Sequence, residues 1–214
     1  MDYKQALDLQ FNLLEKRQKG EIDDTILIVE HPPVITLGRN AKRENVLFSD
    51  EYLKKHNVDI VEINRGGDVT YHGPGQIVGY PIVNIKEQKL GVKHFVYKLE
   101  QMIIDLLKDN YDIDAKRDDI NNGVWVNGQK ITALGLAVKR WVTMHGFALN
   151  VSTNLDFFKL IVPCGIQSRT VTNIEKLTGK NVDIETVNKY VIDYFIDEFK
   201  YTEVANLDLD ELEV

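Results

Sequence analysis

The 214-residue sequence is short of several features, and each shortage excludes a class of protein. Its one cysteine, Cys164, excludes an internal disulfide and a multi-cysteine metal cage. No apolar run approaches the roughly 18–20 residues of a membrane span, and the first residues lack the apolar stretch of a signal peptide. A single thiol also fits a reducing compartment. We therefore expect a cytoplasmic protein without membrane contact.

An excess of positive charge is absent too. The 26 basic and 33 acidic residues give a net charge of −7, whereas a nucleic-acid partner usually requires a basic face. Ordinary surface charge is the simpler interpretation of the short basic doublets Lys42-Arg43, Lys116-Arg117 and Lys139-Arg140. Motifs for phosphate loops, zinc proteases and serine hydrolases are missing. We expect no nucleic acid, no metal and no cofactor.

The spacing of apolar residues predicts an α+β fold, a mixed β-sheet flanked by helices, in one domain over residues 1–214. Amphipathic patterns predict helices at about 3–18, 49–56, 93–110, 154–160 and 184–199. β-Branched and alternating runs predict strands at about 25–30, 34–37, 58–63, 77–85 and 141–151. Asn127-Gly128 predicts the turn of a hairpin whose second strand runs toward Val138. Thr172 to Glu175 has the spacing of a capping box, which predicts another helix start.

Two segments have compositions that suit chemistry. The first runs from Arg65 to Gln76, with four glycines between Gly66 and Gly75. Because glycine lets backbone approach a ligand closely, this composition favours a ligand-binding loop over a plain turn between strands. The second is Pro163-Cys164-Gly165, whose flanking residues indicate a sharply turned, exposed thiol. A buried, inert cysteine is the alternative.

A nucleophilic thiolate needs a cationic neighbour that lowers the pKa of the thiol. Lys130, His72 and His145 are the candidates, and the residues alone leave the choice open. Strand alternation assigns Lys130 and Ala133 to opposite faces of the hairpin, and a simple strand-edge charge is the alternative for Lys130. His31 precedes two prolines, so we expect it to serve a turn.

These segments resemble the signature blocks of the lipoyl(octanoyl) transferases, the octanoyl-carrier-protein:protein N-octanoyltransferases that begin lipoate assembly. The blocks, in the family's order, are Glu30-His31-Pro32-Pro33 with Thr36-Leu37-Gly38-Arg39, Arg65 to Gln76, Gly128-Gln129-Lys130-Ile131 with Ala133-Leu134-Gly135, His145 to Asn150, and Pro163-Cys164-Gly165. They cover about residues 5–180. The resemblance does not extend to the helix at about 184–199 or to the acidic tail. Asp68 departs from the family pattern, which often has Gln there.

The resemblance implies the fold of the biotin- and lipoate-protein ligase catalytic domains. It implies an acyltransferase that moves an octanoyl group from octanoyl-acyl carrier protein to the acceptor lysine of lipoyl domains, in 2-oxoacid dehydrogenase acyltransferase subunits and in the glycine cleavage H protein. Cys164 is then the acyl-thioester nucleophile, and Lys130 lowers its pKa and acts as general acid and base. The implied acyl-binding residues are Arg65, Gly66, Gly67, Asp68, Val69, Thr70, Tyr71, His72, Ala133, Leu134, Gly135, Gly146, Phe147 and Ala148.

Two other functions stay open. An ATP-dependent lipoate-protein ligase on the same fold would need an adenylate site and no essential cysteine. A non-catalytic module would bind an acylated carrier protein with Cys164 merely packed. Because carrier proteins are usually acidic, as this chain is, we also expect a local basic rim for docking, drawn from Arg39, Lys42, Arg43, Lys139, Arg140 and Arg169.

Overall fold

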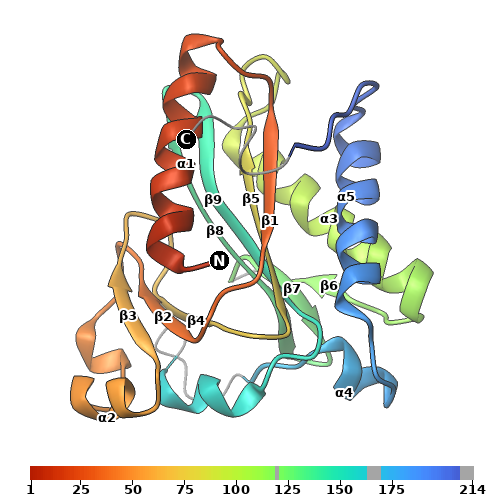
Figure 1. Cartoon of the computed structure of the whole chain (residues 1–214). Helices are drawn as coiled ribbons and strands as arrows, with labels where there is room; N and C mark the ends of the chain where they lie inside the picture. Colours follow the sequence, from red (N-terminus) through yellow and green to blue (C-terminus); the bar gives the residue numbers. More distant parts are fainter. Residues whose placement is uncertain (119–120, 163–169, 208–214) are drawn as a thin grey trace.

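Two sheets form the framework of the computed structural model in Figure 1, which describes residues 1–118, 121–162 and 170–207. The six-stranded sheet has the order β1-β5-β9-β8-β7-β6, and its neighbouring strands pair antiparallel. Its strands are β1 Thr25–Val29, β5 Gln76–Ile82, β6 Lys116–Arg117, β7 Gly123–Val126, β8 Gln129–Lys139 and β9 Val142–Asn150. The three-stranded sheet, of order β3-β2-β4, contains β2 Val34–Leu37, β3 Asp59–Glu62 and β4 Val69–His72. β2 pairs parallel with β3 and antiparallel with β4, so the predicted α+β fold with a mixed sheet is confirmed.

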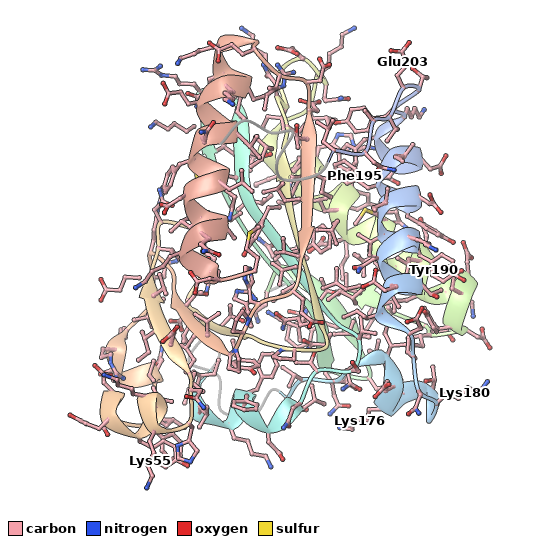
Figure 2. The ribbon with its side chains drawn as sticks, in the orientation of Figure 1. Lys55, Lys176, Lys180, Tyr190, Phe195 and Glu203 are labelled. Carbon is pink, nitrogen blue, oxygen red and sulfur yellow. The ribbon has the colours of Figure 1, made fainter. Side chains whose placement is uncertain are left out.

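Helices cover both faces of the six-stranded sheet (Figure 1). The helical segments are α1 Tyr3–Lys19, α2 Asp50–Lys55, α3 Val92–Tyr111, α4 Ile174–Thr178 and α5 Ile184–Phe199, with 3-10 turns η1 Arg43–Asn45 and η2 Leu155–Leu160. α1 packs on one face, where Leu13 contacts the cluster that contains Val78. α3 and α5 pack on the other face, where Leu99 and Phe195 share a core with Ile77. Figure 2 shows Phe195 on the inward side of α5, while Lys55, Lys176 and Lys180 lie at the periphery.

Local signals explain where the helices begin and end. The side chain of Asp2 accepts a hydrogen bond from the Lys4 backbone N–H and so caps α1, which ends at Gly20 with φ 74°. The apolar residues of α3 lie on the side that packs on the sheet. The spacing of these residues was the basis of the predicted helix at about 93–110, and the observed helix extends only one residue further at each end. Among the described residues, no helix is both long and apolar enough to cross a bilayer.

Three details differ from the expectations. β4 lies inside the glycine-rich segment, where we expected only a loop, because Val69 to His72 pairs with the distant strand β2. β5 ends at Ile82 rather than Ile85. The cap of α4 is Asn173 rather than Thr172: Asn173 Oδ1 accepts from the Lys176 backbone N–H at 2.8 Å, while the backbone N–H of Thr172 is held by the carbonyl of Lys130.

Candidate active site

The glycine-rich segment is clamped between the two sheets by Arg65. The guanidinium of Arg65 donates to the carbonyl of Thr36 at 3.0 Å and to the carbonyl of Gly66 at 2.9 Å. The backbone N–H of Gly66 donates to the carbonyl of Leu136 on β8. A Cβ at Gly135 would lie 2.8 Å from the carbonyl oxygen of Gly66, so only glycine permits this approach of loop and strand. The clamp fixes the loop over one edge of β8.

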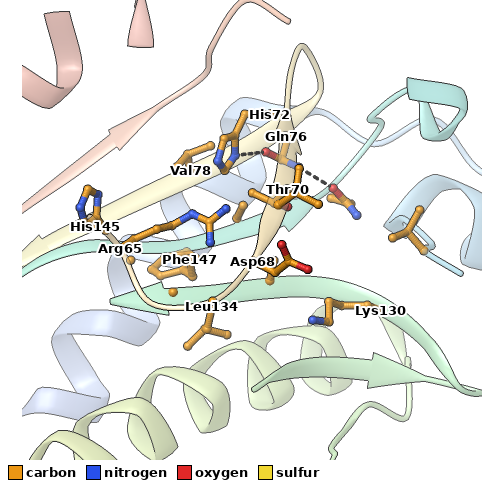
Figure 3. Close-up of a pocket in the computed structure, with 18 of the residues that line it drawn as sticks. Arg65, Asp68, Thr70, His72, Gln76, Val78, Lys130, Leu134, His145 and Phe147 are labelled. Carbon is orange, nitrogen blue, oxygen red and sulfur yellow. Dashed lines mark hydrogen bonds between the residues drawn. The ribbon is translucent and has the colours of Figure 1, made fainter. Parts of the chain in front are cut away.

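A pocket opens where this loop, β5, β8 and β9 meet (Figure 3). It encloses about 790 Å³ of space, part of which is open solvent at its mouth. Most of the predicted acyl-binding residues line it, namely Arg65, Gly67, Asp68, Val69, Thr70, His72, Ala133, Leu134, Gly135, Gly146, Phe147 and Ala148. Lys130 lines it as well. Segments more than 60 residues apart in the sequence therefore surround one space.

Two of the predicted residues do not line this pocket. Tyr71 is 1 % exposed and belongs to the core of the smaller sheet, where its ring stacks on Phe157 at a centroid distance of 5.0 Å. Strand alternation in β4 turns Tyr71 away from the side that His72 and Thr70 present to the pocket. Gly66 instead lines a second groove that shares Lys130 with the pocket.

A β-bulge decides where Lys130 points. On β7, Val124 pairs with Thr132 and Trp125 pairs with Lys130, so Ile131 has no partner across the strand pair. One extra residue reverses the alternation of side chains. Lys130 and Ala133 consequently line the same pocket, and the prediction that they lie on opposite faces is wrong.

Both the stem and the backbone of Lys130 are held in place. Its Nζ lies 4.8 Å from the centroid of the Trp125 ring. A Cβ added to Gly123 would lie 3.4 Å from the Cε of Lys130, so the lysine stem runs close to the backbone of β7. Its backbone N–H donates to the carbonyl of Thr170 at 3.0 Å, and its carbonyl accepts from Thr172 at 2.9 Å. The chain that follows residue 169 is thus hydrogen-bonded directly to Lys130.

Cys164 and Arg169 lie outside the described residues, so the role predicted for Cys164 stays a prediction. Both neighbouring segments are anchored at the site. On one side, the backbone N–H of Val162 donates to the carbonyl of Asn45 at 2.8 Å. The Asn45 amide in turn donates to Asp68 Oδ2 at 2.8 Å. On the other side lies the contact of Thr170 with Lys130.

The candidate histidines are buried, and burial keeps them neutral near pH 7. Burial first, and then the nearby charges of His31 and Arg65, lowers the pKa of His72 to about 3. Burial, with the charges of Arg65 and Arg39, lowers the pKa of His145 to about 4. A neutral imidazole supplies no cation to a thiolate, so the charges favour Lys130 over both histidines as the partner of a thiolate.

His31 is buried and does more than serve a turn. It is 1 % exposed, its Nδ1 lies 2.8 Å from the carbonyl oxygen of Met1, and its Nε2 lies 2.8 Å from the hydroxyl of Tyr80. Burial lowers its pKa to about 4. With Tyr3 and His72 it forms a ring-to-ring cluster at one wall of the pocket.

Several lining residues were not among those predicted to bind the acyl group. Gln76 and Asn150 are paired across β5 and β9, and their side chains hydrogen-bond at 2.9 Å. The period-2 pattern of β5 could have identified Val78 and Tyr80 as one face. No local signal indicates Tyr3, Phe158 or Val171, because the packing of distant segments brings them to the pocket.

The residues expected to form a docking rim fall into two groups. Arg39, Lys42 and Arg43 follow β2 beside the Arg65 loop, where the backbone N–H of Arg39 donates to the carbonyl of Arg65. Lys139 is the last residue of β8 and Arg140 begins the turn after it, so Lys139 lies four residues, about 13 Å along the strand, beyond the pocket residue Gly135. Of the two groups, the first is the one with a backbone hydrogen bond to the pocket-lining residue Arg65, and we take it as the candidate rim.

Comparisons with known proteins agree with this geometry. The family described as lipoyl protein ligase A/B catalytic domain matches residues 2–196. A curated octanoyltransferase from Alkaliphilus metalliredigens is 57% identical over 94% of this chain and 92% of its own length. A second, from Caldicellulosiruptor saccharolyticus, is 50% identical over 99% of this chain and 92% of its own length.

Solved structures share the fold at low identity. A lipoate-protein ligase A bound with ATP superposes with a TM-score of 0.76 at 14% identity, over 96% of this chain and 86% of its own. A bipartite lipoate protein ligase from Thermoplasma acidophilum gives 0.74 at 15% identity, over 96% and 85%. A biotin protein ligase from Aquifex aeolicus gives 0.52 at 18% identity, over 78% and 70%. The predicted likeness to lipoate- and biotin-ligase folds is therefore confirmed.

Proposed function

This chain belongs to the lipoyl protein ligase A/B catalytic domain family, and we propose that it transfers an octanoyl group from an acyl carrier protein to the acceptor lysine of a lipoyl domain, through a thioester on Cys164. It is an acyltransferase, and its identity of 50–57% to octanoyltransferases supports the octanoyl group. The donor, the thioester and the acceptor are proposed from the resemblance to the octanoyltransferases, and the pocket described above is compatible with them.

The first half-reaction exchanges one thioester for another. The Cys164 thiolate attacks the carbonyl carbon of the donor thioester, a new C–S bond forms, and the bond to the carrier's thiol breaks. The departing thiolate takes a proton from the Lys130 ammonium, so Cys164 becomes a neutral thioester and Lys130 a neutral amine. No activation of the acyl group is needed, because a thioester is already reactive toward thiolate and amine.

The second half-reaction forms the amide. The neutral amine of the acceptor lysine attacks the octanoyl thioester, the C–N bond forms, and the C–S bond to Cys164 breaks. Lys130 accepts the proton that the attacking nitrogen loses, which restores the ammonium beside the Cys164 thiolate. One residue thus serves both half-reactions.

The observation that carries this proposal is the position of Lys130 at the wall of a pocket suited to an acyl chain. Phe147, Ala148, Val78 and Leu134 give that pocket an apolar lining, and each buried CH₂ contributes about 0.8 kcal/mol to binding. Two residues of extended chain span at most about 7 Å. The chain therefore allows no more than that between Cys164 and Val162, whose backbone N–H donates to the carbonyl of Asn45 beside the pocket residue Asp68. This limit supports a thiol near the pocket mouth.

The acceptors that we propose are the lipoyl domains of 2-oxoacid dehydrogenase acyltransferase subunits and the glycine cleavage H protein. Docking of an acidic carrier would use Arg39, Lys42 and Arg43, the basic residues beside the pocket. Arg43 also forms an ion pair with Asp50, and Lys42 lies 3.5 Å from Glu44. The rim is therefore partly neutralised, and its contribution to binding is expected to be modest.

Intact-protein mass spectrometry tests the proposal. The full chain is mixed with octanoyl-acyl carrier protein, without nucleotide, and then with an apo lipoyl domain. We expect a mass increase of one octanoyl group on Cys164, which disappears as the lipoyl domain gains the same mass. Transfer that strictly requires ATP would instead indicate a ligase. A carrier protein that binds without leaving an adduct would indicate a binding module.

A further inference from the structure

One oxygen of the pocket is buried and lacks a partner. Asp68 Oδ1 is inaccessible to solvent and has no hydrogen-bond partner among the described residues. Its sister atom Oδ2 accepts from the Asn45 amide at 2.8 Å, which fixes the plane of the carboxylate. A buried acceptor without a donor is costly unless a ligand supplies the missing hydrogen bond.

The charges around the pocket limit which chemical groups could bind Asp68 Oδ1. Among the described residues that line the pocket, Asp68 is the only acid, and Arg65 and Lys130 are the cations. His72 and His145 are neutral near pH 7 because burial lowers the pKa of each. A carboxylate accepts hydrogen bonds and donates none. The missing partner is therefore a hydrogen-bond donor, and a cationic donor gains most.

The position of Asp68 in the pocket limits the choice of ligand further. Asn45 bonds to Asp68 through its side chain and to Val162, two residues before Cys164, through its carbonyl. Figure 3 shows the Asp68 carboxylate on the side of the pocket toward which the Lys130 amine points. A group bound at Asp68 Oδ1 would therefore lie near the end of the pocket where acyl transfer is proposed.

We infer that Asp68 binds the ammonium group of the acceptor lysine; this inference rests on the proposed function. A free lysine has a pKa of about 10.4, so the acceptor arrives at the acyl-enzyme as an ammonium. Lys130 is then a neutral amine, and Arg65 remains a cation among the described residues that line the pocket. An ammonium also carries one proton too many for attack. Of the two protons that its nitrogen loses on becoming an amide, Lys130 takes the second. The first leaves to water from the Asp68-bound ammonium.

The experiment compares two nucleophiles on the same octanoyl-enzyme. The acyl-enzyme is formed from octanoyl-acyl carrier protein and then mixed, at pH 7, with an apo lipoyl domain or with hydroxylamine. Hydroxylamine is neutral at that pH, so it gains nothing from an anionic site. For Asp68→Asn we expect the ratio of second-order rate constants, lipoyl domain over hydroxylamine, to fall about tenfold or more, which corresponds to about 1.4 kcal/mol. Asn45→Ala, which frees Oδ2, should lower the same ratio by a smaller factor.

Asp114→Asn is the matched control, because its carboxylate pairs with Lys108 at the surface, and the ratio should not change. An unchanged ratio in Asp68→Asn and Asn45→Ala would overturn the inference. So would an Asp68→Asn protein that folds but forms no acyl-enzyme, because Asp68 would then act in the first half-reaction. If the unaltered chain forms no acyl-enzyme, the proposed function fails before the two nucleophiles are compared.

Discussion

The two faces of the six-stranded sheet have opposite character. The face under α3 and α5 is an apolar core, where Ile77, Phe95 and Val191 are at most 1 % exposed. The face under α1 begins as an apolar core and becomes polar toward the pocket, where His31 bonds to Tyr80 and Gln76 bonds to Asn150. Strands β5 and β9 contribute alternate residues to both faces. Polar pocket residues such as Gln76 and Asn150 thus lie on the α1 face, and substitutions confined to one face should separate effects on stability from effects on chemistry.

The largest expected effect is on octanoyl transfer, from a substitution that should leave the packing on both faces of the sheet unchanged. Cys164→Ala should lower octanoyl transfer by a factor on the order of 10⁴ or more, since no thioester can form. Its urea unfolding midpoint should stay close to that of the unaltered chain. Mass spectrometry measures the formation of the acyl-enzyme, and equilibrium unfolding measures the stability. Substantial residual transfer by Cys164→Ala would contradict the thioester route.

A change on the apolar face should do the reverse. Phe95→Ala deletes a fully buried ring and should lower the free energy of unfolding by about 3–5 kcal/mol. Phe11→Ala is the matched control, because that ring on α1 is 42 % exposed, and its cost should stay below about 1 kcal/mol. Below its unfolding temperature, Phe95→Ala should keep a single-turnover transfer rate close to that of the unaltered chain. A large loss of that rate in the folded variant would mean that the two faces are coupled.

Substitutions of Lys130 test whether this residue takes part in both half-reactions. Lys130→Ala should slow both half-reactions by about 10²-fold, the usual contribution of a proton-transfer group. Lys130→Arg should restore acylation better than amide formation, because arginine keeps its charge but hardly releases its proton. Rapid-quench rates of the two half-reactions and thiol alkylation against pH measure this. If Lys130→Ala leaves the thiol pKa and both rates unchanged, Lys130 is only a strand-edge charge.

The polar face predicts an acid limit to stability. The folded state lowers the pKa of His31, His72 and His145 below the ordinary value of 6.5, to between about 3 and 4. The unfolded chain therefore binds more protons as the pH falls. Stability is complete above about pH 6.5 and falls toward pH 4, by up to about 1.4 kcal/mol per pH unit for each histidine.

Urea unfolding at several pH values measures that slope. His145→Asn should make the slope shallower by about one proton, because the imidazole that it removes is the one whose pKa burial lowers to about 4. A stability that is flat from pH 6.5 to pH 4.5 would show that these histidines do not resist protonation in the folded chain.

The smallest expected effect concerns docking. Lys42→Glu should raise the KM for the carrier protein about threefold and leave the rate of amide formation from preformed acyl-enzyme unaltered, because a rim charge acts mainly on association. Lys139→Glu, at the far end of β8, should change neither value. Equal effects of the two substitutions on KM would place the carrier elsewhere or reduce the effect to net charge.

Local pattern was sufficient for the helices and for most strands. The apolar stripe of α3, the Asp2 and Gly20 ends of α1 and the Asn127-Gly128 turn each depend on residues within a few positions of one another. The motif blocks likewise identified most of the segments that line the pocket. Such features can be predicted from the sequence because their physical causes act over one or two turns of chain. These causes are side-chain periodicity, capping and turn geometry.

Distant contacts decided the rest. Ile131 becomes a bulge only because β7 and β8 pair in one register, and that bulge turns Lys130 into the pocket. The neutral state of His72 and the unpartnered oxygen of Asp68 exist only once other segments bury them. The sequence by itself determined the elements and the residue types available for acyl transfer. The tertiary structure determined which side chains share the pocket and in what charge state, because strand register, burial and local dielectric are properties of the packed chain and not of its neighbouring residues.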